Sequence, residues 1–190
     1  MIAILGAGPH GRELADIARR CGYSDLRFYD DDPDHGYLSV RSAYGPYVIG
    51  AAWPDVRRRI WAQAGGLEAA TLVDPEASIV GEVRLCAGVA VAAGARVITG
   101  SEIGAHTHLN LNATVSRGCQ LGEFVTVCPG VNISGGVLVE DDVFIGVGAV
   151  IKHELVIGHG ALIGAGAVVV DDVKPGELVM GNPGRARPVG

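Results

Sequence analysis

The residues best suited to acid–base chemistry in this chain are a histidine and the glutamate that follows it, His153-Glu154. An imidazole can accept a proton near neutral pH, and a neighbouring carboxylate can orient the ring and stabilise its charged form. Arg117 lies 36 residues earlier. It stays protonated at any working pH, so it can bind an anion but cannot be a base. We predict His153 as a general base oriented by Glu154, with His108 as the reserve candidate; a solvated histidine on a turn is the alternative.

A second chemical pattern, Gly-x-Gly-x-x-Gly, begins at Gly6, directly after the apolar residues 2–5. A helix is expected over 12–20 and a strand over 26–29, which ends in three aspartates at 30–32. A strand, a glycine turn, a helix and a strand with an acidic end form a nucleotide-binding half-fold, because the helix N-terminus suits phosphate. A plain tight turn between strand and helix is the alternative.

The element that must position the candidate base is a repeat of six residues. An aliphatic residue returns at every sixth position from Ile79 to Val169 without a break. No α-helix has that period, and a simple amphipathic strand would alternate with period two. An unbroken six-residue repeat predicts a parallel β-helix, which is a solenoid of short strands.

Two further columns of the repeat define its geometry. The residue two before each aliphatic is small or β-branched almost throughout, so both can share a narrow interior. The residue three after it is usually Gly, and otherwise often Asn, Asp or His, types that tolerate positive φ at a corner. Three strands and three corners would close one coil. Arg117, Gly135 and His153 should then line up on one edge, the outer two about 10 Å apart.

The chain is expected to form two domains, a small α/β domain at 1–73 and a β-helix domain at 74–190. Within the first we expect a loop over 33–51 around a short strand near 47–49, a helix at 54–64 and a last strand at 71–73. The run Arg57-Arg58-Arg59 in this helix is interpreted as a solvated face.

Composition excludes several classes of protein. A net charge of −6 gives no basis for binding nucleic acid or an anionic membrane. Every apolar run is interrupted well short of the ~20 residues that a membrane span needs. The chain opens on a strand with no room for a leader, so we expect a cytoplasmic protein. The four cysteines show neither zinc-site nor disulfide spacing.

The repeat, with the glycine turn before it and Gly181-Asn-Pro-Gly-Arg after it, resembles the left-handed β-helix acyltransferases with hexapeptide repeats. The flanks narrow the resemblance to bacterial sugar acyltransferases related to sialic-acid O-acetyltransferases and UDP-amino-sugar N-acetyltransferases. It covers nearly the whole chain. It implies transfer of an acyl group from acetyl-CoA, or another acyl-CoA, to an amino or hydroxyl group of a nucleotide-linked sugar. It also implies a homotrimer with active sites between neighbouring β-helices.

The resemblance also assigns roles to residues. Gly6, Gly8, His10 and Gly11 would approach the pyrophosphate of a UDP-sugar, and Asp31 or Asp32 would meet its ribose or base. Pro9 departs from the expected Gly or Ser and removes one phosphate-facing donor. The tail at 179–188 would grip coenzyme A, unless it merely caps the β-helix. The residues that match this role are Gly146, Gly164, Ala165, Asn182, Pro183 and Arg185.

The catalytic stretch departs from the family. There the base is a His in a Val-x-His-acid-Cys stretch, whereas this chain has Val115-Ser-Arg117-Gly118-Cys119. The lost pattern returns at Ile151-Lys-His153-Glu154 on the same corner column. A binding or regulatory protein that has lost the chemistry is therefore an alternative. A metalloenzyme would need three convergent His ligands, and His106, His108, His153 and His159 show no such spacing, so no metal is expected.

A partner surface is predicted from the outward column just before each aliphatic. From position 138 onward this column is apolar throughout, and we expect one continuous apolar face, which is typical of an oligomer interface. Its members are Leu138, Phe144, Val150, Val156, Leu162 and Val168.

Overall fold

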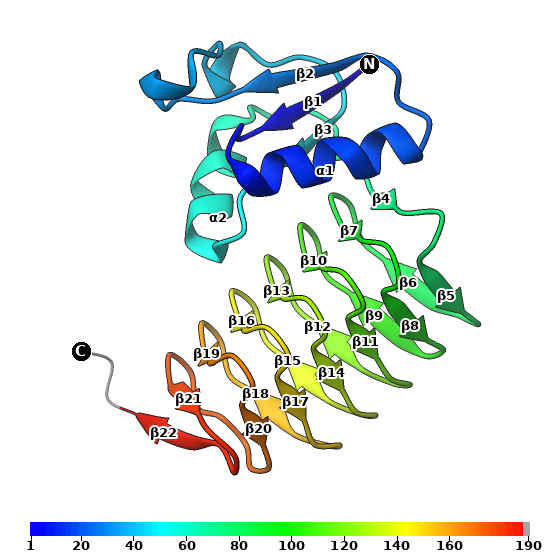
Figure 1. Ribbon diagram of the computed structural model, residues 1–190, viewed down its shortest axis with the longest axis vertical. Coiled ribbons are helices and arrows are strands. Elements are labelled where there is room, and N and C mark those ends of the chain that lie inside the picture. The colour runs from blue at the N-terminus through cyan, green and yellow to red at the C-terminus, as the bar shows by residue number, and fades with distance from the viewer. Residues whose placement is uncertain (188–190) are drawn as a thin grey trace.

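The computed structural model describes residues 1–187, and it contains a small α/β domain and a parallel β-helix (Figure 1). The α/β domain has a three-stranded parallel sheet in the order β2-β1-β3. Two helices and two short 3₁₀ turns connect the strands. The elements are β1 (Ile2–Leu5), α1 (Pro9–Arg20), β2 (Leu26–Tyr29), the 3₁₀ turns Pro33–His35 and Val40–Ser42, β3 (Tyr47–Ile49) and α2 (Pro54–Gln63).

The β-helix has three faces, each a sheet of parallel strands, which we name the docked, second and third faces. The docked face holds β4 (Leu72–Val73), β7 (Ala90–Val91), β10 (His108–Leu109), β13 (Thr126–Val127), β16 (Phe144–Ile145), β19 (Leu162–Ile163), β21 (Leu178–Met180) and the antiparallel β22 (Arg185–Arg187). The second face holds β5 (Ser78–Val80), β8 (Arg96–Ile98), β11 (Thr114–Val115), β14 (Asn132–Ile133), β17 (Val150–Ile151) and β20 (Val168–Val169). The third face holds β6 (Val83–Leu85), β9 (Ser101–Ile103), β12 (Gln120–Leu121), β15 (Leu138–Val139) and β18 (Val156–Ile157).

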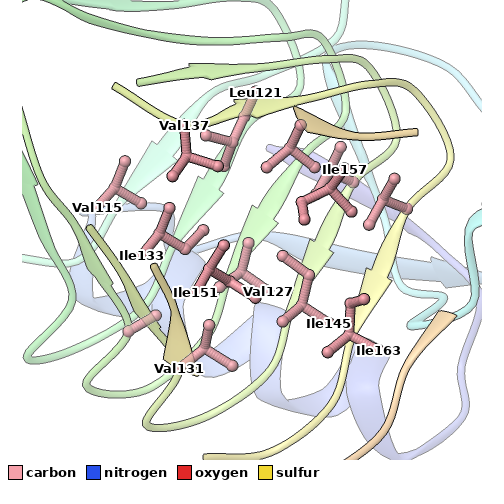
Figure 2. Close-up of a cluster of buried hydrophobic side chains, with 14 of the residues drawn as sticks. Val115, Leu121, Val127, Val131, Ile133, Val137, Ile145, Ile151, Ile157 and Ile163 are labelled. Carbon is pink, nitrogen blue, oxygen red and sulfur yellow. The ribbon is translucent and has the colours of Figure 1, made fainter. Parts of the chain in front are cut away.

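Both predicted interior columns are buried. From Val89 on, the aliphatic residues and the small residues two before them form one continuous core. Figure 2 shows aliphatic side chains from all three faces meeting in this interior. Each fully buried aliphatic side chain contributes about 1.5–3 kcal/mol relative to an exposed one, which is why the repeat tolerates no break.

From Gly88 to Gly166 the corner column has positive φ as predicted, at nine glycines and at five residues with side chains, whereas Asp172, the last predicted member, does not. The five are His106, Asn112, Phe124, Asp142 and Glu154. Phe124 is the unexpected member, since bulky residues rarely adopt positive φ. His106, Phe124 and Asp142 follow one another at 18-residue intervals on the edge that precedes the docked face. This edge therefore presents three side chains where the other corners mostly have glycine.

The α/β domain lies along the side of the β-helix, against the docked face (Figure 1). Helix α2 packs on the three side chains of that edge. The Trp61 ring meets Phe124 edge-on with ring centroids 5.8 Å apart, and the Arg58 guanidinium lies 4.3 Å from the centre of the Phe124 ring. Trp53, at the start of α2, stacks on Phe144 of the docked face at 4.4 Å.

Two expectations about the α/β domain are wrong. The strand at 71–73 does not complete the small sheet, because β4 pairs with β7 and belongs to the docked face. The run of three arginines is not a solvated face. Arg57 is fully buried and Arg58 forms an ion pair with Asp142, so only Arg59 is exposed.

The prediction of one continuous apolar outer face is also wrong. Residues six apart lie on successive faces of the prism, and only residues 18 apart share a face. The apolar column therefore divides into three separate pairs, one on each face. The pairs are Leu138 with Val156, Phe144 with Leu162, and Val150 with Val168.

No helix within residues 1–187 combines the length and the apolar character needed to cross a membrane.

Candidate active site

The predicted catalytic residues lie on the edge between the second and third faces. The amide of Gly136 donates to the Arg117 carbonyl and the amide of Glu154 donates to the Gly135 carbonyl, both at 3.0 Å. These bonds stack three coils, so Arg117, Gly135 and His153 share one column, as the repeat predicted. Together with Thr99 and the flanking corner residues they line an open groove of about 690 Å³.

His153 is exposed in this groove. Among the described residues, its ring forms no hydrogen bond or ion pair, and neither does the Glu154 carboxylate. In this structure Glu154 therefore does not orient the His153 ring through a hydrogen bond. The Glu154 side chain instead leans over Gly136, where a Cβ would lie 3.3 Å from its Cγ atom. The glycines leave the floor of the groove open between Arg117 and Glu154.

The glycine turn of the α/β domain is built by close backbone contacts. A Cβ on Gly11 would overlap the Gly6 carbonyl oxygen, and a Cβ on Gly50 would lie 2.5 Å from the Gly11 Cα. These glycines let α1 begin directly against the end of β1. Gly8 differs, because nothing lies within 4 Å of the place its Cβ would occupy. The turn therefore has open space at Gly8 and packed backbone at Gly6 and Gly11.

A pocket of about 240 Å³ opens at the carboxyl ends of β1 and β2, where parallel sheets bind ligands. Its lining includes Gly6, Asp31 and Arg59, the exposed member of the three consecutive arginines. Asp31 also accepts a hydrogen bond from the Val40 amide at 3.1 Å. Asp32 lies outside this lining and caps the first 3₁₀ turn through the Asp34 amide.

Asp30 occupies part of the same pocket. Its carboxylate accepts a 2.6 Å hydrogen bond from the Ala7 amide in the glycine turn and contacts the His35 ring at 2.8 Å. Burial alone would raise the pKa of Asp30, but the Ala7 and Asp32 amides and the His35 ring together hold this pKa below its ordinary value. Asp30 is therefore a fixed negative charge that shapes the turn.

His10 points away from this pocket and toward the β-helix. Its Nε2 atom lies 3.0 Å from Nδ1 of His108 on β10, and its Nδ1 atom lies 3.0 Å from the Glu13 carboxylate. His10 and Glu13 also line a separate cavity of about 240 Å³ with Asn110 and Leu111. His108 itself is buried, so the reserve candidate for the base cannot reach a substrate in this structure.

Arg57 joins the two domains in the buried part of the interface beside His108. Its Nη1 atom donates to the carbonyls of Ala51 and Ala52, at 2.7 and 3.2 Å. Its Nη2 atom donates to the Phe124 and Val125 carbonyls, at 2.8 and 3.1 Å, and to the Thr126 hydroxyl at 2.9 Å. Burial lowers the pKa of Arg57 to about 9, while Asp142 opposes this effect, so Arg57 is charged at neutral pH.

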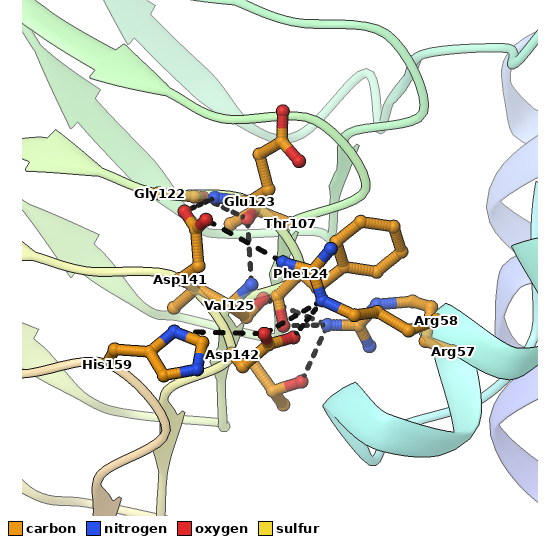
Figure 3. A network of polar contacts seen from close by, with 11 residues as sticks. Arg57, Arg58, Thr107, Gly122, Glu123, Phe124, Val125, Asp141, Asp142 and His159 are labelled. Carbon is orange, nitrogen blue, oxygen red and sulfur yellow. Dashed lines mark hydrogen bonds and ion pairs between the residues drawn. The ribbon is translucent and has the colours of Figure 1, made fainter. Parts of the chain in front are cut away.

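Arg58 forms a second, outer link between the domains. Its Nε atom donates to both oxygens of Asp142, at 2.6 and 2.8 Å, and Asp141 and His159 lie at the rim of this contact (Figure 3). Figure 3 also shows Arg57 and Arg58 reaching from the same helix to the same corner. Helix α2 thus contributes one buried and one half-exposed arginine to the docking interface.

The residues matched to coenzyme A lie near the last coils. A Cβ on Gly146 or on Gly164 would crowd the next coil, so both glycines are needed for coil stacking. Ala165 is exposed at the end of a corner ridge that also presents Leu111 and Val147, which are 50% and 54% exposed. Asn182 and Pro183 lie exposed in the exit loop, whose Gly184 amide donates to the Val168 carbonyl, and Arg185 lies exposed at the start of β22. Pro188, the last residue of the predicted signature, lies outside the described residues.

These residues are chemically suited to coenzyme A, because an apolar ridge suits a pantetheine chain and an exposed arginine suits phosphate. The histidines do not form a metal site. His106 and His108 lie in the docking interface, His159 lies at the rim of that interface beside Asp142, and His153 lies on the edge between the second and third faces. Within residues 1–187 no group of three or more His, Cys, Asp or Glu could hold a metal ion.

The hexapeptide coils, the glycine-turn domain docked beside them and the corner groove define a β-helix protein of the hexapeptide-repeat class. Residues 1–52 match the family model of the PglD N-terminal domain. Over 150 residues the chain is 32% identical to GDP-perosamine N-acetyltransferase of Escherichia coli O157:H7, which covers 68% of each protein. The chain belongs to the hexapeptide-repeat sugar acetyltransferase family, and it is an acetyltransferase.

Two solved structures are similar over almost their whole length. The acetyltransferase domain of PglB from Neisseria gonorrhoeae FA1090, in complex with acetyl coenzyme A, has 30% identity and a TM-score of 0.90 over 98% of each chain. PerB from Caulobacter crescentus, in complex with CoA and GDP-perosamine, has 28% identity and a TM-score of 0.91 over 98% of this chain and 97% of that one.

Proposed function

We propose that this protein transfers an acetyl group from acetyl-CoA to the amino group of a nucleotide-linked amino sugar. The observation that carries the proposal is the likeness along nearly the whole chain to PerB, whose structure holds CoA and GDP-perosamine. The likeness to the PglB domain with acetyl coenzyme A supports the choice of acyl donor. A nitrogen acceptor is favoured over a hydroxyl because the curated relative is an N-acetyltransferase.

The proposed acceptor site combines the glycine turn with the pocket beside it. The open space at Gly8 and the start of α1 suit the diphosphate, because free amides at a helix N-terminus favour negative charge. Arg59 would add a positive charge and Asp31 a carboxylate for ribose or base hydroxyls. Gly6 and Gly11 shape the turn, and Asp32 supports the following loop. UDP and GDP both fit this description, so the linked nucleotide is a question for the assay.

The proposed catalytic groove contains His153, Glu154 and Arg117. His153 would accept the proton that the attacking amine loses, and the Glu154 carboxylate would turn toward the imidazolium once it forms. Arg117 would bind an anionic group of the acceptor across the Gly135-Gly136 floor. Ala165, Asn182, Pro183 and Arg185 would hold the acyl donor, on coils kept close by Gly146 and Gly164.

An acetyl-transfer assay with GDP-linked and UDP-linked 4-amino sugars tests the proposal. We expect release of free CoA that depends on one of these acceptors, with the matching nucleotide as a competitive inhibitor. Acetyl-CoA binding without turnover on any amino sugar would instead favour the alternative, a binding or regulatory protein on the same scaffold. Turnover on a sugar hydroxyl alone would refute the amine acceptor.

We also propose that the protein works as a homotrimer. The apolar pairs on the second and third faces are Val150 with Val168 and Leu138 with Val156. Leu138, Val150 and Val156 are exposed and Val168 is half-buried, and the α/β domain covers none of them. Such pairs on two faces suit contact with two neighbouring copies around a three-fold axis. Sedimentation at micromolar concentration should give three times the monomer mass of 19.6 kDa. A single species at the monomer mass would contradict the trimer.

A further inference from the structure

The hydrogen-bonded pair His10 and His108 has no part in the function proposed so far. Two observations distinguish it from an ordinary interface contact. His10 belongs to the glycine turn, at the second residue of α1, while His108 lies 98 residues later on the docked face. His108 is 1% exposed, and its Nε2 atom is buried with no hydrogen-bond partner among the described residues.

The partners of the two rings determine where their protons lie. The Glu13 carboxylate can only accept, so Nδ1 of His10 carries a proton. In neutral His10 the Nε2 atom then has a lone pair, and Nδ1–H of His108 must donate to it. Arg57 Nη1 also contacts this nitrogen, but at 3.4 Å, whereas His10 lies at 3.0 Å and the two Nη1 bonds to the Ala51 and Ala52 carbonyls are shorter, at 2.7 and 3.2 Å; His10 is therefore the closer partner of His108 Nδ1. His108 is thus a neutral donor to the glycine turn.

Protonation of His10 would reverse this arrangement. Both nitrogens of a charged His10 donate, so His108 would have to accept at Nδ1 and carry its own proton on Nε2. That N–H would be buried without an acceptor, which is costly. The groups that face the pair from the packed elements are Glu13 on α1, Arg57 on α2 and His106 on the corner; all but Glu13 oppose a further positive charge.

We propose that His108 is a positioning residue for the acceptor, one that holds the glycine turn at a fixed place against the β-helix through a hydrogen bond from its Nδ1 atom to His10. The inference rests on the proposed function, in which this turn holds the diphosphate of the nucleotide sugar. It makes acceptor binding depend on docking of the two domains and on the neutral form of both rings.

The direction of the pH effect follows from the same geometry. Burial lowers the pKa of His10, although Glu13 opposes this, and burial lowers the pKa of His108 well below its ordinary value. The folded state therefore favours neutral rings that the unfolded state protonates below pH 6.5. The docked arrangement is fully stable above that pH and weakens as the pH falls below it. Acceptor affinity should fall with it.

Two substitutions separate positioning from simple packing. His108→Leu keeps apolar volume and removes the donor. His108→Asn keeps a donor near the place of Nδ1 and removes the unpartnered Nε2. Its amide can also turn to present its oxygen, so it accepts from a protonated His10. We expect His108→Leu to raise KM for the nucleotide sugar about tenfold at unchanged KM for acetyl-CoA, the effect of one lost hydrogen bond. We expect His108→Asn to keep the wild-type KM for the nucleotide sugar. In this variant that KM should no longer increase as the pH falls.

Hydrogen exchange at the first turn of α1 gives a readout that needs no substrate. His108→Leu should speed exchange there, acid should speed it in the wild type, and His108→Asn should exchange slowly at both pH values. If wild type and His108→Leu exchange alike, or if His108→Asn stays as acid-sensitive as the wild type, the positioning role is refuted. Failure of every amino sugar to turn over would refute the proposed function, while the exchange result would still decide the role of His108.

Discussion

Replacing Arg57 by leucine should lower the free energy of unfolding by about 3–5 kcal/mol, as expected when several buried hydrogen bonds from a charged group are lost. The guanidinium donates to four carbonyls and one hydroxyl that come from both domains. Within the described residues, leucine would leave the Ala51 and Phe124 carbonyls without the donor they have here, while the Ala52 and Val125 carbonyls keep the Thr126 hydroxyl and the His108 amide. Each buried acceptor that loses its donor is costly to desolvate. Denaturant unfolding should therefore show a lower midpoint for Arg57→Leu.

The fluorescence of Trp53 and Trp61 provides a local readout, since both lie where α2 meets the β-helix. We expect loss of the α/β domain contacts to precede unfolding of the coils in this variant. Arg59→Leu is a matched control for stability, because Arg59 is exposed on the same helix. Arg57→Lys keeps the charge but not the two-armed geometry, so it should fall between the two. Equal stability of Arg57→Leu and wild type would contradict the bridging role.

The β-helix could be predicted from sequence because one physical constraint repeats sixteen times. Each aliphatic from Ile79 to Val169 enters the same narrow interior, and each corner needs a residue that tolerates positive φ. The same period led to the error in the outer column. Six residues advance the chain by one face, so Leu138 and Phe144 point in different directions although they follow each other in the repeat.

Arg57 could not be recognised from its own neighbourhood, because three consecutive arginines on a short helix usually lie in solvent. A signal was present elsewhere. His106, Phe124 and Asp142 replace glycine at corners 18 residues apart, where a side chain has a conformational cost. Three such residues on one edge indicate a surface against which another part of the chain packs. Their partners, Arg58 and Trp61, become clear only when the two domains are placed together.

In the candidate site, too, some contacts could be predicted from the sequence and others depend on how the two domains dock. The glycine turn was predicted because its backbone contacts are local, and Gly6 and Gly11 touch across five residues. The hydrogen bond between His10 and His108 joins segments 98 residues apart and depends on domain docking, so neither histidine alone indicated it. The column of Arg117, Gly135 and His153 was predicted across 36 residues, because the 18-residue coil fixes which corners are neighbours.

Replacing His153 by glutamine should lower kcat for acetyl transfer by about 10²- to 10⁴-fold, the usual contribution of a general base. Glutamine keeps a polar side chain of similar reach but cannot accept the amine proton at neutral pH. The site is exposed, so the variant should unfold like the wild type and bind acetyl-CoA equally well. Glu154→Gln should lower kcat less, since it removes only the predicted stabilisation of the charged ring.

His159→Gln is the matched control, because His159 is also an exposed corner histidine but lies on the edge beside α2. Its kcat should equal that of the wild type. The comparison matters because His153 has no hydrogen-bond partner in the described residues, so its proposed role depends on contacts that the acceptor and, in the proposed trimer, a neighbouring copy would add to the groove. If His153→Gln keeps full activity as an intact trimer, His153 is not the base. Since His108 is buried, the remaining explanation would then be direct attack by an amine that is already neutral.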